Sequence, residues 1–137
     1  MLMTAMGSNP LHCLVCNGEV DPASMPLPAS MVELVAHWQS IGGAFETLEL
    51  DSGPYEAMAQ LELADVRSSV NEEGMRLRLD LDRLRRCFYV VFQVMDNDGR
   101  FVVPDTCPEC GHRLVEFGTG RSTRLICDQD SLAWVNP

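Results

Sequence analysis

The stretch "CPECGHRLVEFGTGRSTRLICDQD", residues 107–130, carries the strongest fold signal in the chain. It begins with a tight pair, Cys107-x-x-Cys110, followed at once by glycine. The segments "RLVEF" and "STRLIC" then predict two strands, and "GTGR" predicts the turn between them. Cys127 ends the second strand, and Asp130 stands where a fourth cysteine would repeat the first pair. We therefore expect a complete cysteine turn at 107–110 followed by a hairpin, whose last part has lost one of the cysteines of a regular ribbon.

The cysteine spacing points to a metal site. Cys107-x2-Cys110-x16-Cys127-x2-Asp130 fits the spacing of a zinc ribbon except at its last residue. A second pair, Cys13-x-x-Cys16, lies far upstream and is followed by Asn-Gly, residues that tolerate a tight reversal. In a zinc knuckle such a turn aims two sulfurs at one point, and two knuckles supply the four tetrahedral ligands of Zn²⁺.

Two ligand sets compete for this metal. We prefer the four cysteines of the two complete pairs, Cys13, Cys16, Cys107 and Cys110. The alternative set is Cys107, Cys110 and Cys127, completed by Asp130 or His112, whose oxygen and nitrogen atoms can also bind zinc. Either set fills four positions, so the sequence predicts structural Zn²⁺ rather than a catalytic ion with an open position.

Between the two pairs the chain reads as mainly helical. Apolar spacing predicts a helix from Met31 to about Leu50, and Pro54 predicts the first turn of a second helix over 54–64. Residues 69–86 alternate like a strand over part of their length, but the capping-box pattern Ser69-x-x-Glu72 favours a helix. "CFYVVFQV" (87–94) predicts a strand, "MDNDGR" (95–100) a hairpin turn, and "SLAWV" (131–135) a last short strand.

These elements predict one α+β domain over residues 1–137, with residues 1–9 as a loose start. The helical middle segment should pack on a small antiparallel sheet, with zinc-knuckle or zinc-ribbon turns near both ends. Six cysteines without a secretory signal indicate a reducing compartment, so we expect a cytoplasmic protein without disulfides. No apolar run reaches the length of a membrane span, which predicts no membrane partner.

Charge favours a protein partner over nucleic acid. The net charge is −10, the chain has no lysine, and residues 1–66 contain acidic side chains but no arginine. Such a surface steers a basic protein partner and repels phosphates. The one basic cluster, Arg76, Arg78, Arg83, Arg85 and Arg86, is interleaved with Asp80 and Asp82 and preceded by two glutamates, which indicates a salt-bridged face.

The segments "NPLHCLVCNGEV", "LDSGPYE", "SSVNEEG" and "CPECG" resemble an uncharacterised bacterial family described as zinc-ribbon-containing and nucleic-acid-binding. The similarity runs over residues 9–130 and corresponds to the C-terminal half of that family, so a function in the N-terminal half is expected to be missing. The resemblance implies a helical middle between metal-binding turns. It also implies a late ribbon to which Cys107, Cys110 and Cys127 correspond, while Asp130 departs from the pattern.

Together these features predict a non-catalytic zinc-binding adaptor with an acidic surface for a protein partner, including an inhibitor or immunity-type role. His12, His37 and His112 form no acid–base pattern, so we expect no enzyme. The first alternative is a zinc-ribbon protein that binds nucleic acid through the arginine face. The second is a redox or metal-dependent enzyme.

Overall fold

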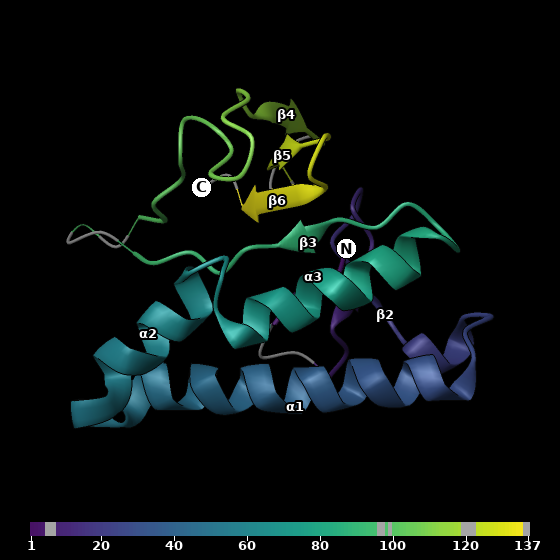
Figure 1. Ribbon diagram of the computed structural model, residues 1–137, viewed down its shortest axis with the longest axis horizontal. Helices are drawn as coiled ribbons and strands as arrows, with labels where there is room; N and C mark the ends of the chain where they lie inside the picture. The colour runs from purple at the N-terminus through teal and green to yellow at the C-terminus, as the bar shows by residue number, and fades with distance from the viewer. Residues whose placement is uncertain (5–7, 96–97, 99, 119–122, 136–137) are drawn as a thin grey trace.

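A computed structural model describes residues 1–4, 8–95, 98, 100–118 and 123–135. The elements are β1 (Leu11–His12), β2 (Glu19–Val20), η1 (Pro22–Ser24), α1 (Ala29–Asp51), η2 (Gly53–Tyr55), α2 (Glu56–Ala64), α3 (Ser69–Asp82), β3 (Tyr89–Val90), β4 (Val115–Phe117), β5 (Arg124–Cys127) and β6 (Leu132–Val135). The three helices lie on one side of the four-stranded sheet, and in the view of Figure 1 α3 lies between α1 and β3. The predicted α+β class, with helices on a small sheet, is confirmed.

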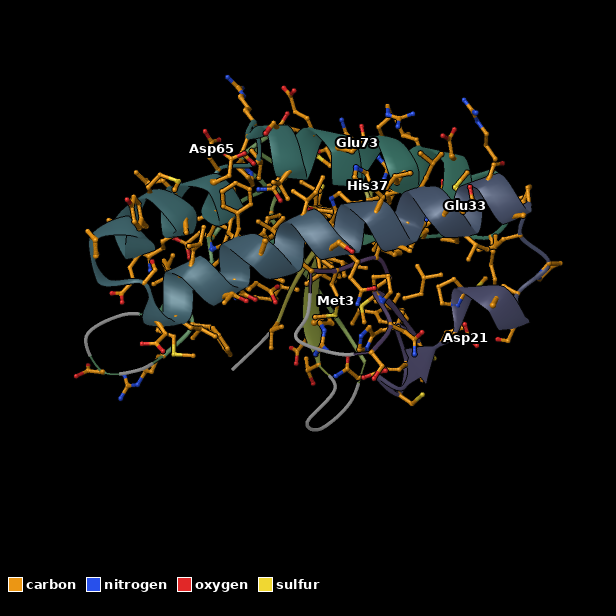
Figure 2. The ribbon with its side chains drawn as sticks, turned by 90° about the horizontal axis from the view of Figure 1, so that it is seen from below. Met3, Asp21, Glu33, His37, Asp65 and Glu73 are labelled. Atoms are coloured by element: carbon orange, nitrogen blue, oxygen red, sulfur yellow. The ribbon has the colours of Figure 1, made fainter. Side chains whose placement is uncertain are left out.

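The three predicted helices are all present. α1 runs unbroken through Gly42 and Gly43, and α2 follows a short turn that contains Pro54. α3 begins one residue away from the predicted cap, because the Ser68 side chain, rather than that of Ser69, accepts the backbone N–H of Asn71. Figure 2 shows α1 and α3 lying side by side, with His37 of α1 next to Glu73 of α3.

The sheet contains both strand directions. Its order is β3-β6-β5-β4, with β4, β5 and β6 antiparallel and β3 parallel to β6. The predicted hairpin therefore forms as β4 and β5, although four of its turn residues, 119–122, lie outside the described part of the chain. The first cysteine pair sits between β1 and β2, which form a separate two-stranded sheet.

The predicted strand over 87–94 is shorter than expected. Only Tyr89 and Val90 belong to the ladder with β6. Beyond them, the side-chain amide of Gln93 donates to the Val135 carbonyl (3.0 Å) and accepts the Val135 N–H (2.6 Å). A side chain thus replaces the main-chain pairing. Met95 and Phe101 form an isolated bridge across the predicted hairpin turn, of which residues 96, 97 and 99 are outside the description.

The sequence predicts a loose start over residues 1–9, of which 5–7 lie outside the described part of the chain, but the first residues pack into the fold. Leu2 is fully buried and bridges Leu11 on one side and Tyr89 on the other. Its N–H donates to the Phe88 carbonyl (2.8 Å), and its carbonyl accepts the Val90 N–H (2.9 Å). The first residues therefore join the two-stranded sheet to the larger one. A strand is not predicted for the first residues because their apolar segment is too short.

The helix layer and the sheet meet at a polar contact inside the core. The Tyr89 hydroxyl donates to the side-chain oxygen of Asn71 (2.5 Å), and the Asn71 amide donates to the Leu63 carbonyl (2.7 Å). Trp38 packs edge-to-face on Tyr89, with ring centroids 5.9 Å apart. Gly74 lies against both rings, and a Cβ there would come within 2.8 Å of the Trp38 ring. This packing fixes how α1 and α3 sit on the sheet.

Candidate metal centre

Four potential ligands come together beside the β5–β6 turn: Cys107, Cys110, Cys127 and Asp130. Their ligand atoms all lie within 4.8 Å of one another. The thiols of Cys107 and Cys127 donate to the same Asp130 oxygen, Oδ2, at 3.1 and 3.3 Å. The sulfurs of Cys110 and Cys127 are 3.5 Å apart. Cys107 and Cys127 are buried, and the group could hold a metal ion.

The first two ligands are positioned by the turn over 107–112. The Cys107 N–H donates to the His112 carbonyl (2.8 Å), and the Gly111 N–H donates to the Cys107 carbonyl (2.8 Å). Gly111 adopts a positive φ of 73°, which glycine reaches without a steric cost. The N–H groups of Cys110 and Glu109 hydrogen-bond the Cys107 sulfur. These bonds direct both sulfurs to the same side of the turn.

The turn over 127–132 repeats this frame, by which we mean the pairing of the cysteine with the fifth residue after it and the positive φ of the fourth. An aspartate takes the place of the second cysteine. Cys127 pairs with Leu132 in the β5–β6 ladder, just as Cys107 pairs with the residue five positions after it. Ser131, four positions after the cysteine, has a positive φ of 54°, as Gly111 does in the first turn. Asp130 therefore occupies the position in the second turn that Cys110 occupies in the first turn.

Burial and mutual hydrogen bonds shift the pKa values of these potential ligands. Burial raises the pKa of the Cys107 thiol to about 12, and the hydrogen bond to Asp130 adds to this effect. The bond to Asp130 is also the main cause of the raised pKa of Cys110. Hydrogen bonds from Cys110 and Cys107 lower the pKa of the Asp130 carboxyl. A divalent cation binding here would displace thiol protons, so its affinity would fall as pH falls.

The preferred ligand set is not the one that the structure assembles. Within the described residues, Cys13 and Cys16 are not part of the group around Cys107. Their turn touches the opposite end of β5, where Arg124 Nη2 donates to Asn17 Oδ1 (2.7 Å). Cys127 lies three strand positions further along, about 10 Å at the usual rise. The local hairpin brings the second turn to the first, so the described structure groups the alternative ligand set and leaves the far pair apart from it.

Of the two residues proposed to complete the alternative set, Asp130 is the one that lies with the three cysteines. His112 is exposed, and it contributes to the turn through its backbone carbonyl, which accepts the Cys107 N–H. Its ring does not belong to the ligand group within the described chain. Cys87, the remaining cysteine, is buried in the core beside Leu81. Equal spacing in Cys-x-x-Cys-Gly and Cys-x-x-Asp-Ser was the signal that could have favoured Asp130.

The arginine cluster is largely ion-paired, as its sequence pattern suggested. Arg76 pairs with Glu73 and Arg83 with Asp80 (2.8 Å), while Arg86 pairs with Asp82 (3.6 Å) and Asp128 (2.8 Å). Arg86 also lies over the Phe88 ring, 4.8 Å from its centroid. These acidic neighbours reduce the positive potential that a phosphate backbone would meet.

None of the helices in the described part of the chain combines the length and apolar character that a bilayer span requires. Comparison with known proteins adds no relationship: no protein-family model, curated protein or solved structure matches the chain.

Proposed function

We propose that this protein is a non-catalytic zinc-binding adaptor, in which zinc held by Cys107, Cys110, Cys127 and Asp130 stabilises the fold and an acidic surface receives a protein partner. The observation that carries the proposal is the convergence of four ligand atoms within 4.8 Å, from two turns of the same frame.

The donor set and its spacing suit zinc. Zinc takes thiolate sulfur at about 2.3 Å and carboxylate oxygen at about 2.0–2.2 Å in a tetrahedron, which places neighbouring ligand atoms roughly 3.5–3.8 Å apart. The distances between Cys107 or Cys127 and Asp130, 3.1 and 3.3 Å, and the 3.5 Å between Cys110 and Cys127 are close to this spacing. Three thiolates disfavour calcium and magnesium, which prefer oxygen ligands.

The positions of the ligands support a structural role for the metal. Four protein ligands fill a tetrahedral zinc site and leave no position for a reacting water. Cys107 ends the long connection from β3, and Cys127 ends β5, so a metal would fasten that connection to the sheet. Burial of these two side chains also keeps water from the ion.

The surface at the α1–α2 corner supports a protein partner. Four large side chains are exposed there by roughly half or more: Leu50, Tyr55, Met58 and Leu61. The acidic residues Asp51 and Glu56 stand between them in the sequence and are also exposed. Exposed apolar side chains rimmed by charge are typical of interaction sites. The acidic rim would steer a basic partner, and the apolar side chains would provide the buried contact.

Metal analysis tests the zinc assignment. We expect the wild type to retain zinc after desalting, Cys127→Ser to lose it, and Asp130→Ala to bind it at least about tenfold more weakly. Cys13→Ser serves as the matched cysteine control and should keep the zinc of this site. Loss of zinc from Cys13→Ser together with retention by Cys127→Ser would refute the assignment and favour the far-apart ligand set.

Paired binding measurements test the adaptor role. Partners captured on immobilised wild type should be released by salt and should be lost with the double variant Tyr55→Ser, Leu61→Ser. Val115→Ser, which changes an equally exposed apolar residue on β4, should retain them. Salt-sensitive retention of the wild type on an oligonucleotide column, lost on neutralising the arginines of α3, would instead establish the nucleic-acid alternative.

A further inference from the structure

The turn over residues 13–18 has the same frame as the turns of the metal centre. The Cys13 N–H donates to the Gly18 carbonyl (2.9 Å), and the Asn17 N–H donates to the Cys13 carbonyl (2.9 Å). Asn17 has a positive φ of 58°, at the position equivalent to Gly111. The correspondence therefore extends to both backbone bonds and to the left-handed residue.

The sulfur environment matches as well. The N–H groups of Cys16 and Val15 hydrogen-bond the Cys13 sulfur and lower the pKa of its thiol, to which the Cys16 side chain also contributes. Backbone donors stand in the same positions around Cys107. The Cys16 sulfur lies over Gly18, where a Cβ would be 3.5 Å from it. Backbone N–H groups directed at sulfur favour the thiolate, which is the form that binds a metal.

This turn has only two metal-binding side chains of its own. No third histidine, cysteine, aspartate or glutamate joins Cys13 and Cys16 within the described residues. Cys16 is exposed, and the neighbouring Val15 is 66% exposed. The turn is therefore accessible to another molecule, whereas the buried cysteines of the metal centre are not.

We propose that Cys13 and Cys16 form one half of a zinc site that is completed by the same two residues of a second copy of the chain. Zinc needs four ligands, and a two-fold axis through the ion supplies the other two thiolates from an identical turn. Val15 of each copy would be covered in the contact. We choose a second copy as the partner because it carries the same turn, with its two sulfur ligands in the same arrangement. The shared site does not depend on occupation of the intrachain centre.

Zinc-dependent dimerisation tests this inference. Native mass spectrometry and light scattering, in a non-chelating reductant, should give a zinc-bridged dimer for the wild type that reverts to a monomer on chelation. The dimer should hold one zinc ion more than its two intrachain centres account for. Cys16→Ser changes an exposed side chain and should stay monomeric while it keeps the intrachain zinc.

Two controls separate this inference from the proposed function. Cys110→Ser disables the intrachain centre and should still dimerise with zinc, and Cys87→Ala, which removes a thiol outside both sites, should behave as the wild type. Loss of intrachain zinc alone bears on the proposed function only. The shared site is overturned if the wild type remains monomeric in excess zinc, or if Cys16→Ser dimerises as readily as the wild type.

Discussion

A buried glutamate on α1 makes stability depend on pH in a way that can be worked out. Glu46 is 5% exposed, and burial raises its pKa to about 7 from an ordinary value of 4.5. The Thr4 side chain hydrogen-bonds the carboxyl and partly offsets this effect, but Oε2 has no partner within the described chain. The folded protein therefore favours the protonated carboxyl, whereas the unfolded chain releases its proton near pH 4.5.

The direction and size of the effect follow from linkage. Below pH 4.5 Glu46 is protonated in both states, and its contribution to stability is complete. Between pH 4.5 and about 7 the unfolded chain loses the proton first, so the free energy of unfolding falls as pH rises and levels off above pH 7. The difference of 2.5 pKa units corresponds to a loss on the order of 3 kcal/mol.

Glu46→Gln should remove this loss. We expect the variant to gain stability over the wild type as pH rises from 5 to 8, by about 2 kcal/mol, because the amide cannot ionise. Urea unfolding at several pH values, with metal kept saturating, measures the difference directly. Glu33→Gln, an exposed position on the same helix, should track the wild type throughout. A constant difference between Glu46→Gln and the wild type across this range would refute the reasoning.

Four further predictions test the core, helix α1 and the metal centre. Gly74→Ala should destabilise the fold by about 1–3 kcal/mol in urea unfolding, because its Cβ would meet the Trp38 ring at 2.8 Å. Gly43→Ala, where nothing lies within 4 Å, should instead stabilise α1 by about 0.5–1 kcal/mol. Asn71→Leu should cost at least about 2 kcal/mol by the same assay, because it leaves buried carbonyls and a tyrosine hydroxyl unsatisfied. Asp130→Cys should raise zinc affinity in a chelator competition, and an unchanged affinity would argue against Asp130 as a ligand.

The helices and the ribbon hairpin could be predicted because their signals are local. Helical spacing in α1, Pro54 before α2 and the short apolar run that ends at Cys127 are each signals carried by neighbouring residues. The burial of Leu2 could not be predicted, because a bridge between two sheets is a property of segments far apart in the chain.

The ligand set shows how local and distant signals conflict. A preference for complete cysteine pairs favoured Cys13 and Cys16, although they are separated from Cys107 by the whole helical layer in sequence. The structure instead brings in Asp130, which belongs to the same hairpin as Cys127. Residue type alone ranked the aspartate lower. Its position in a turn that repeats the frame of Cys107–Cys110 carried more information.

The contact between Gln93 and Val135 has a consequence for the order of folding. The two residues are 42 positions apart, and the ribbon, the segment over 107–130 that carries the candidate ligands, lies entirely between them. Closing so long a loop costs chain entropy before any contact along the β3–β6 seam can form. A metal ion bound within the ribbon would shorten that loop in the unfolded chain. It would therefore act as a cross-link that speeds closure of the seam and that stays in place in the folded protein.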